Sequence, residues 1–219
     1  MQDIASEVDQ SASAPDQGGS DWNLRLKYIN RRQQSWAETY DWQCLYKEYN
    51  SLSTGTSMPT ISLPSDYRKM AGYPKIATIG GLANTEIPLV DPQERTQYET
   101  TDKIGWVSGD PNRYIFGIPL TLATFASGSS VFIPYFYTPS SLVSPADVSP
   151  IPDPEYLVQG AIADLYKARE DPRFPSANQD AERILARMLE NENTKGIAYN
   201  DRIKTTDETR TGFVIGRDQ

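Results

Sequence analysis

The chain of 219 residues contains no histidine and one cysteine, Cys44. Histidine is the commonest general base, proton shuttle and metal ligand, so its absence removes the usual centres of acid–base and metal chemistry. A lone cysteine forms no disulfide within the chain and, without histidine, no zinc site. Cys44 also lies in an apolar stretch of helical pattern, so we expect a buried, unreactive side chain.

The chain also lacks an excess of basic residues. Its 21 Lys and Arg residues stand against 29 Asp and Glu, a formal net charge of −8, and no strong Lys/Arg run occurs. Proteins that grip nucleic acid through its phosphates normally carry a basic patch or stripe. We therefore expect no grip of that kind. The composition, 38% hydrophobic and 23% charged, is typical of a globular protein with a buried core.

Motifs that carry catalysis are missing as well. The glycines do not have the spacing of a phosphate-binding loop, and no nucleophile elbow occurs. The paired acids Asp207 and Glu208 lie in a polar tail, where no pocket holds their geometry. We expect no enzyme activity, no catalytic residue, no metal site and no cofactor.

A long uncharged stretch raises the question of a membrane. Residues 114–146 carry no charged side chain and are long enough for a spanning helix. Pro119, Pro134 and the Gly/Ser cluster at Ala126–Ser130 interrupt a helix, and the flanking runs are rich in β-forming residues. We predict a hairpin of buried strands over 114–137, with its tip at Ala126–Ser130, and no membrane association.

Composition shifts divide the chain into four domains. We expect a flexible acidic arm over 1–20, without a secretory signal, and an extended arm over 196–219. Residues 21–50 and 151–195 form a helical domain, and 51–150 form an inserted β-rich domain. The predicted class is α+β: a bundle of one N-terminal and two C-terminal helices, with an inserted small antiparallel β-sandwich or barrel-like block and extended termini.

The first predicted helix occupies residues 21–50 and begins at Ser20 or Asp21, either of which is a good cap. Its apolar residues recur at helical spacing, and most of its charged residues fall on other faces. We interpret it as a helix that packs against the core with one face. The apolar face comprises Trp22, Leu26, Ile29, Trp36 and Tyr40, and the residues on other faces are Arg25, Arg31, Arg32 and Glu38.

Two further helices follow the β-rich domain. Asp153 caps the second, Pro154 suits its first position, and the helix ends before Pro172. The third begins at Ser176, which forms a capping box, and ends within 191–196.

Short runs of β-forming residues, separated by turn signals, predict the strands of the inserted domain. One helical turn is expected after the cap Asp91, with Pro92 in its first position. The predicted strands are Thr60–Leu63, Lys75–Ile79, Glu86–Val90, Gly105–Val107, Tyr114–Leu122 and Val131–Tyr137.

The stretch Leu63–Met70, LPSDYRKM, gathers an acid, two bases, a hydroxyl and a phenol within eight residues. The preceding residues alternate as a strand does, Pro64 ends the hydrogen-bond ladder, and Asp66 favours a turn. We interpret the stretch as a structural corner between a strand and a short helix. Tyr67 and Met70 return to the core, and the polar residues serve the turn.

Several short motifs in a fixed order resemble the head-to-tail adaptor, or connector, proteins of tailed bacteriophages. Each motif alone has little specificity, and the resemblance rests on their order and spacing over residues 21–193. The resemblance is carried by Tyr40-Asp41-Trp42 with Leu45 and Lys47, LPSDYRKM, Gly109-Asp110-Pro111 with Tyr114–Gly117, Val131–Pro139, Ile151-Pro152-Asp153 leading into Glu155–Ala161, and Glu170–Arg173.

This resemblance implies a structural virion protein in the neck of a phage, assembled in the host cytoplasm. Twelve copies form a ring beneath the portal protein, extend the DNA channel, and dock a downstream tail, nozzle or tail-completion protein. Packaged DNA passes through without specific binding. A negative net charge suits such a channel, because phosphate contacts would raise the affinity for DNA.

Two partner-binding hypotheses come from the residues. Near the C-terminus an apolar triplet flanked by glycines and arginines suits strand addition or pocket anchoring on the portal, although such a cluster at a chain end is also incidental in many proteins. The hairpin tip suits contact with a tail component. The portal-binding set is Arg210, Phe213, Val214, Ile215 and Arg217, and the tail-side loop is Ser127, Gly128 and Ser129.

Two alternatives stay open. One is a tail-tube or nozzle component, which shares the logic of ring assembly. The other is a different class, a carbohydrate-binding module or hydrolase on a β-sandwich, with Trp106, Tyr135 and Tyr137 as its sugar platform.

Overall fold

The computed structural model describes residues 15–54, 59–77, 85–99, 101–111, 113–119 and 127–214, and only the backbone of 52–54, 85, 127–128 and 195–214. The chain forms two compact units. The helical unit comprises Met1–Gln43 and Ser141–Gln219, and the sheet unit comprises Cys44–Ser140. The expected acidic arm falls largely outside the described residues.

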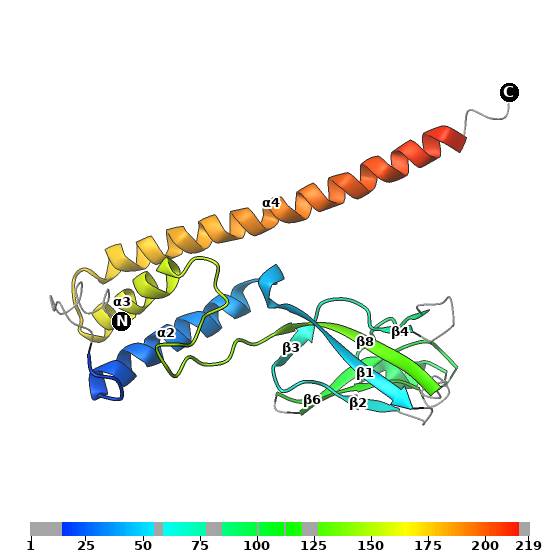
Figure 1. Ribbon diagram of the computed structural model, residues 1–219, viewed down its shortest axis with the longest axis horizontal. Helices are drawn as coiled ribbons and strands as arrows, with labels where there is room; N and C mark the ends of the chain where they lie inside the picture. Colours follow the sequence, from blue (N-terminus) through cyan, green and yellow to red (C-terminus); the bar gives the residue numbers. More distant parts are fainter. Residues whose placement is uncertain are drawn as a thin grey trace. The chain divides into compact units, whose positions relative to one another are not determined.

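The described residues of the helical unit form three helices (Figure 1): α2 (Ser20–Thr39), α3 (Glu155–Ala168) and α4 (Phe174–Val214). Helix α3 contacts both of the others. It is therefore apolar almost all round, as a helix with neighbours on two sides must be. Its buried hydrophobic side chains are Tyr156, Leu157, Ala161, Ile162, Ala163, Leu165 and Tyr166.

The ends of α3 and the start of α4 follow the local sequence. The Asp153 carboxylate accepts a hydrogen bond from the Glu155 N–H at 3.2 Å, as a capping residue does. After α3 the backbone of Glu170 turns left-handed, with φ of 55°. Asp171 then accepts the N–H of Arg173 at 2.9 Å. The predicted start of the last helix at Ser176 is two residues late, because Asp171 and not Ser176 caps it.

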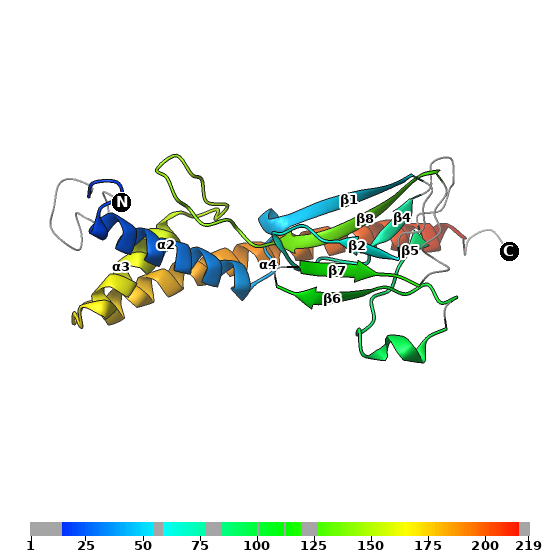
Figure 2. The same cartoon turned by 90° about the horizontal axis from the view of Figure 1, so that it is seen from below.

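The described residues of the sheet unit form two antiparallel sheets (Figure 2). Strands β1, β8, β4 and β5 lie in that order in the larger sheet, β3 also pairs with β8, and the smaller sheet has the order β2-β7-β6. The strands are β1 (Tyr46–Thr54), β2 (Thr60–Ser62), β3 (Tyr67–Met70), β4 (Lys75–Ala77), β5 (Thr85–Glu86), β6 (Trp106–Asp110), β7 (Arg113–Gly117) and β8 (Ser127–Tyr137).

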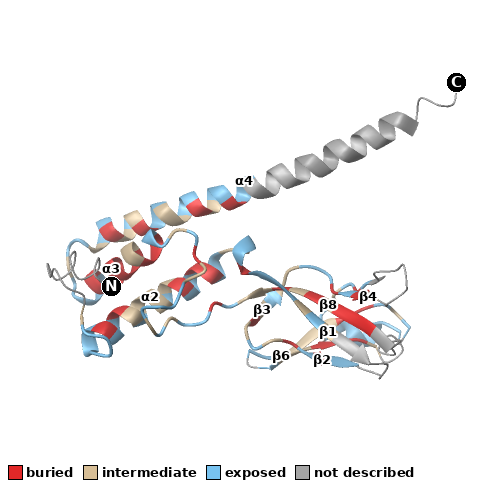
Figure 3. Cartoon of the chain, viewed as in Figure 1, coloured by how far each residue is buried: buried red, intermediate tan, exposed pale blue. Residues whose placement is uncertain are grey.

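One hydrophobic core joins the two sheets. Alternate residues of β8 are buried in it, and Phe116 of β7 enters it from the smaller sheet at 0% exposed. Figure 3 shows these buried positions in red along β8. The two sheets therefore pack as a small sandwich, which confirms the predicted α+β class. The buried set is Ile61, Leu63, Tyr67, Ile76, Ile87, Phe116, Ile118, Val131, Ile133 and Tyr135.

Several predicted elements are wrong in type or extent. The first helix ends at Thr39, a 3₁₀ turn spans Gln43–Leu45, and β1 follows where helix was predicted to residue 50. Cys44 is exposed, not buried. The third helix does not end within 191–196, since its backbone continues helically to Val214. Arg25 was placed outside the apolar face of the first helix but is buried, at 5% exposed.

The predicted hairpin over 114–137 is also wrong. Strand β7 pairs with β2 and β6, whereas β8 pairs with β1, β3 and β4, so the two runs belong to different sheets. The linking residues 120–126 lie outside the described residues. All six predicted strands overlap an observed one, and β1 and β3 were not predicted.

Within the part of the chain that the structure describes, no helix combines the length and apolar character that a membrane crossing needs.

Candidate interaction site

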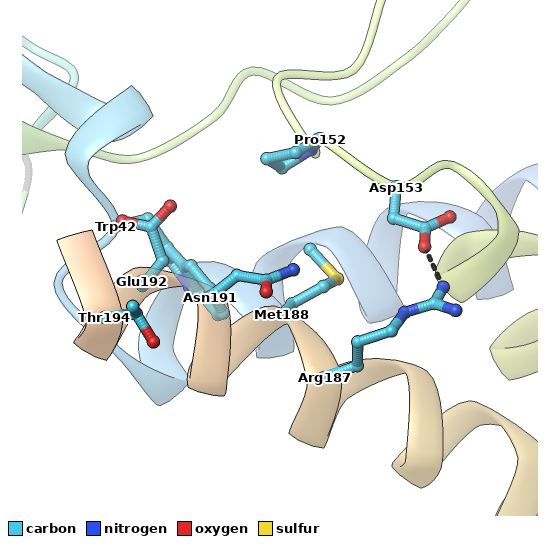
Figure 4. A pocket seen from close by; sticks show the side chains of 8 residues that line it. All are labelled: Trp42, Pro152, Asp153, Arg187, Met188, Asn191, Glu192 and Thr194. Atoms are coloured by element: carbon cyan, nitrogen blue, oxygen red, sulfur yellow. Dashed lines mark hydrogen bonds and ion pairs between the residues drawn. The ribbon is translucent and has the colours of Figure 1, made fainter.

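A pocket in the helical unit is lined by three chain segments that are distant in sequence (Figure 4). Its volume is about 640 Å³. The first segment follows α2, the second precedes α3, and the third is the middle of α4. We call it the Trp42 pocket, and its lining residues are Trp42, Pro152, Asp153, Arg187, Met188, Asn191, Glu192 and Thr194.

Trp42 is held rigidly beside this pocket. Its ring stacks on Trp36 with centroids 4.7 Å apart and an interplanar angle of 16°. Its indole N–H donates to the Trp36 carbonyl at 2.7 Å, and the rings of Tyr40 and Trp42 pack in a T-shaped arrangement with centroids 5.5 Å apart. Both tryptophans are 0% exposed. The Tyr40 hydroxyl in turn donates to the side-chain oxygen of Asn193 on α4 at 2.9 Å. The aromatic cluster thus ties the end of α2 to α4.

The polar side of the pocket is built around one ion pair. The Arg187 guanidinium donates to the Asp153 carboxylate, the dashed contact in Figure 4. Asp153 therefore serves two elements, because it also caps α3. Met188 is 5% exposed and contributes apolar surface, while Asn191 and Thr194 are exposed. An apolar wall beside rigid aromatics, with a polar rim, suits the side chain of a protein partner.

A second ion pair braces the helices that carry the pocket. Arg32 on α2 donates to both Asp164 oxygens on α3, at 3.0 and 2.8 Å. Burial by itself lowers the pKa of Arg32, but the hydrogen bonds and the charge of Asp164 outweigh burial and raise it. The pKa of the neighbouring Tyr156 is raised, because burial raises it more than the charge of Arg32 lowers it. Gly160 makes room for the pair, because a Cβ there would lie 2.9 Å from Arg32 Cδ.

The LPSDYRKM stretch forms a corner in the sheet unit, as predicted, but the element after it is strand β3 and not a helix. Asp66 holds that corner. Its carboxylate accepts the Lys47 ammonium at 2.8 Å and the Tyr135 hydroxyl at 3.1 Å, and its carbonyl accepts the Thr138 N–H at 2.7 Å. Burial and the bond to Asp66 raise the pKa of Tyr135 to about 12, so its hydroxyl stays protonated. These polar residues join β1, β3 and β8 and form no reactive set.

The predicted portal-binding residues lie at the end of the chain. Arg210, Phe213 and Val214 belong to the last part of α4, where the backbone is helical. Ile215 and Arg217 lie outside the described residues. Strand addition by the apolar triplet would therefore require the last turn of α4 to unwind. The role of these residues stays a prediction.

The predicted tail-side loop is not a loop at its described positions. Ser127, Gly128 and Ser129 belong to β8, and Ser129 is 1% exposed. Their contact with a tail component stays a prediction.

The aromatic residues considered for a sugar platform do not share a surface. Tyr135 is 4% exposed in the core, and Trp106 lies on β6 of the smaller sheet, whereas Tyr137 lies on β8 of the larger one.

The Trp42 pocket is not apparent from the sequence, although two of the three segments that line it carry family motifs. Tyr40-Asp41-Trp42 and Ile151-Pro152-Asp153 were noted only as family motifs, and the structure brings them together beside α4. No local signal placed them together, because over a hundred residues separate the two segments.

The described residues offer no group of three or more acidic or cysteine side chains that could hold a metal ion.

A comparison with known families identifies the family of this chain. The family model described as "SU10 adaptor protein" matches residues 1–210. No curated protein matches the sequence of this chain. The match covers both units, including the motifs at the Trp42 pocket and the Asp66 corner. The chain therefore belongs to the SU10 adaptor protein family, a family of phage head-to-tail adaptors.

Proposed function

We propose that the protein forms a ring of twelve copies beneath the portal of a tailed phage, extends the DNA channel and docks the tail. The observation that carries this proposal is the family match over residues 1–210. The downstream partner is a tail, nozzle or tail-completion protein, and packaged DNA passes through without specific binding. Adaptor proteins of this kind are structural, and we expect no catalysis.

The Trp42 pocket supports the proposal as a contact between copies. A ring needs two different surfaces on each copy, because the same patch on both partners closes a dimer instead. The pocket provides one of them: an apolar wall with rigid aromatics next to it and a polar rim. A side chain of the next copy is the occupant we propose. The backbone of α4 continues helically beyond Thr194 to Val214, and we propose this stretch for contact with the portal or a neighbouring copy.

The first experiment measures the mass of the purified chain in solution, alone and mixed with candidate portal assemblies. A monomer that becomes a ring on the portal is the expected result. A chain that stays monomeric with every portal, or that forms a stable small oligomer by itself, contradicts the proposal. A ring that binds only a tail tube would favour the tail-tube or nozzle alternative.

A pair of matched variants tests the pocket. Asn191 and Gln179 are both exposed, uncharged residues on α4, but only Asn191 lines the pocket. Asn191→Arg should abolish ring formation, while Gln179→Arg should leave it unchanged. Both variants should unfold at the same temperature as the wild type, since exposed helix positions tolerate arginine. If Asn191→Arg forms normal rings, the pocket is not part of the contact between copies.

A further inference from the structure

The edge of β1 is the feature of the sheet unit that the adaptor proposal does not use. On one side β1 pairs with β8 along Tyr46–Leu52, without a register shift. On its other side no strand lies among the described residues, and Figure 2 shows β1 at the border of its sheet. With nine residues it is far longer than β5, the two-residue strand at the end of the same strand order. An open edge of that length is a template for pairing.

Pro134 determines which backbone groups of β1 point outward. It lies opposite Glu48, has no N–H to donate, and its carbonyl accepts from Ala71 N at 3.0 Å on the far side of β8. Opposed residues of an antiparallel pair alternate between bonded and non-bonded. The Glu48–Pro134 pair is therefore non-bonded, and the N–H and C=O of Glu48 point away from β8. The same holds for Tyr46 and Asn50, two residues to either side.

The usual protection of an edge is absent here. Natural edges carry prolines, bulges or outward lysines. Tyr46–Asn50 contains no proline, and the irregularity of β1 lies beyond it at Leu52/Thr54. Its one lysine, Lys47, is occupied elsewhere: its ammonium binds Asp66 at 2.8 Å and lies 3.8 Å from the centroid of the Tyr137 ring. The described edge over Tyr46–Asn50 is thus regular and carries no proline, bulge or uncommitted lysine.

Glu48 gives the edge a charge preference. It is exposed, and its carboxylate accepts the Tyr46 hydroxyl at 2.7 Å. Among the described residues no Lys or Arg pairs with it. Lys75 lines a cavity together with Glu48, but its ammonium pairs with Glu86 at 3.2 Å. Opposite charges directly across an antiparallel pair stabilise it, and like charges destabilise it. Two β1 strands paired about Glu48 or about Lys47 would place like charges opposite each other.

We propose that the free edge of β1 over Tyr46–Asn50 accepts an extended segment of another protein by antiparallel strand addition, with a Lys or Arg of that segment opposite Glu48. Backbone hydrogen bonds to Tyr46, Glu48 and Asn50 hold the segment, and the ion pair sets its register. This inference does not rest on the ring. It concerns a surface of the sheet unit alone.

The single cysteine allows a direct test on the full chain. Cys44 is exposed and lies two residues before β1. A peptide Thr-Val-Thr-Lys-Thr-Val-Thr is attached to it through a flexible Gly/Ser linker of about ten residues, which spans roughly 17 Å. Tethering raises the effective peptide concentration to about millimolar. Matched peptides carry Glu or Pro in place of the central Lys.

Amide hydrogen exchange by NMR is the measurement. With the Lys peptide, exchange at Glu48 and Asn50 should slow by about tenfold or more. Exchange at Lys47 and Tyr49 should not change, because their amides already face β8. The Glu peptide should slow exchange at these two amides less than the Lys peptide does, and the Pro peptide should not slow it. In the Glu48→Lys variant, the Glu peptide should slow exchange more than the Lys peptide does.

Absent protection, or equal protection by all three peptides, overturns the proposal. The exchange of the Glu48 and Asn50 amides could also be slow already in the chain without a peptide, at concentrations where the mass is that of a dimer. That result would assign the β1 edge to a second copy and overturn the proposal too. The mass measurement with portal assemblies decides the adaptor proposal separately, so that the failure of one is distinguishable from the failure of the other.

Discussion

Replacing Asp66 by alanine should destabilise the sheet unit by about 2 to 3 kcal/mol. The change removes two hydrogen bonds, from Lys47 and from Tyr135, and keeps the backbone bond from Thr138. Lys47 is 46% exposed, so its ion pair contributes about 0.2–1 kcal/mol. Tyr135 is 4% exposed, and a hydrogen bond from it to a charged group contributes about 1.5–3 kcal/mol.

Matched variants separate the two bonds. Lys47→Ala should cost at most about 1 kcal/mol. Tyr135→Phe removes only the hydroxyl and should cost about 1.5 to 3 kcal/mol. The double variant Asp66→Ala/Tyr135→Phe should lose about 1.5 to 3 kcal/mol less than the sum of the single losses, since both single variants remove the same bond.

The assay must report on the sheet unit alone, because a chain with two compact units need not unfold in one step. Trp106 is the only tryptophan of the sheet unit, and Trp22, Trp36 and Trp42 belong to the other. Urea unfolding followed by ¹⁹F NMR of fluorotryptophan-labelled protein therefore resolves the two. A Trp106 transition within about 0.5 kcal/mol of the wild type for Asp66→Ala would refute our account of the corner, and so would a loss seen equally at all four tryptophans.

Other predictions concern the helical unit. Arg32→Ala should lower its free energy of unfolding by about 2–4 kcal/mol, measured at the tryptophans of that unit, because it leaves Asp164, 8% exposed, without its bidentate partner. Gly160→Ala should also destabilise, although alanine favours helix, since its Cβ meets Arg32; a more stable variant would show that the pair moves freely. The side-chain and backbone hydrogen bonds from Arg173 lower the pKa of Asp171 to about 2. The stabilisation from this lowered pKa is fully present above about pH 4 and is lost as the pH falls through about 2. Carboxyl NMR titration should find this midpoint, and Arg173→Ala should raise it.

The sequence predicted the elements whose signals are local. Pro154 after Asp153 determined the start of α3, and Asp171-Pro172 determined the break before α4. The six predicted strands were found because β-forming runs stood between turn residues. Strand β1 was missed because YKEYNSLST has no turn signal separating it from the preceding helix, and six of its nine residues are polar. The end of α4 was misplaced because Asn and Gly weaken a helix without ending it.

The tertiary structure alone decided what those elements meet. The uncharged run after Tyr114 has the pattern of a hairpin, but β8 pairs with β1 and β3 and not with β7. This pairing buries Val131, Ile133 and Tyr135 in the core that both sheets share. Strand pairing depends on buried faces that lie far apart in the sequence. The same reason applies to the Trp42 pocket and the Asp66 corner. Trp42, Asp153 and Asp66 stand in family motifs of the sequence, whereas Met188 does not. Only folding places Trp42 and Met188 at one pocket and Asp66 between Lys47 and Tyr135, because no local rule relates residues so distant along the chain.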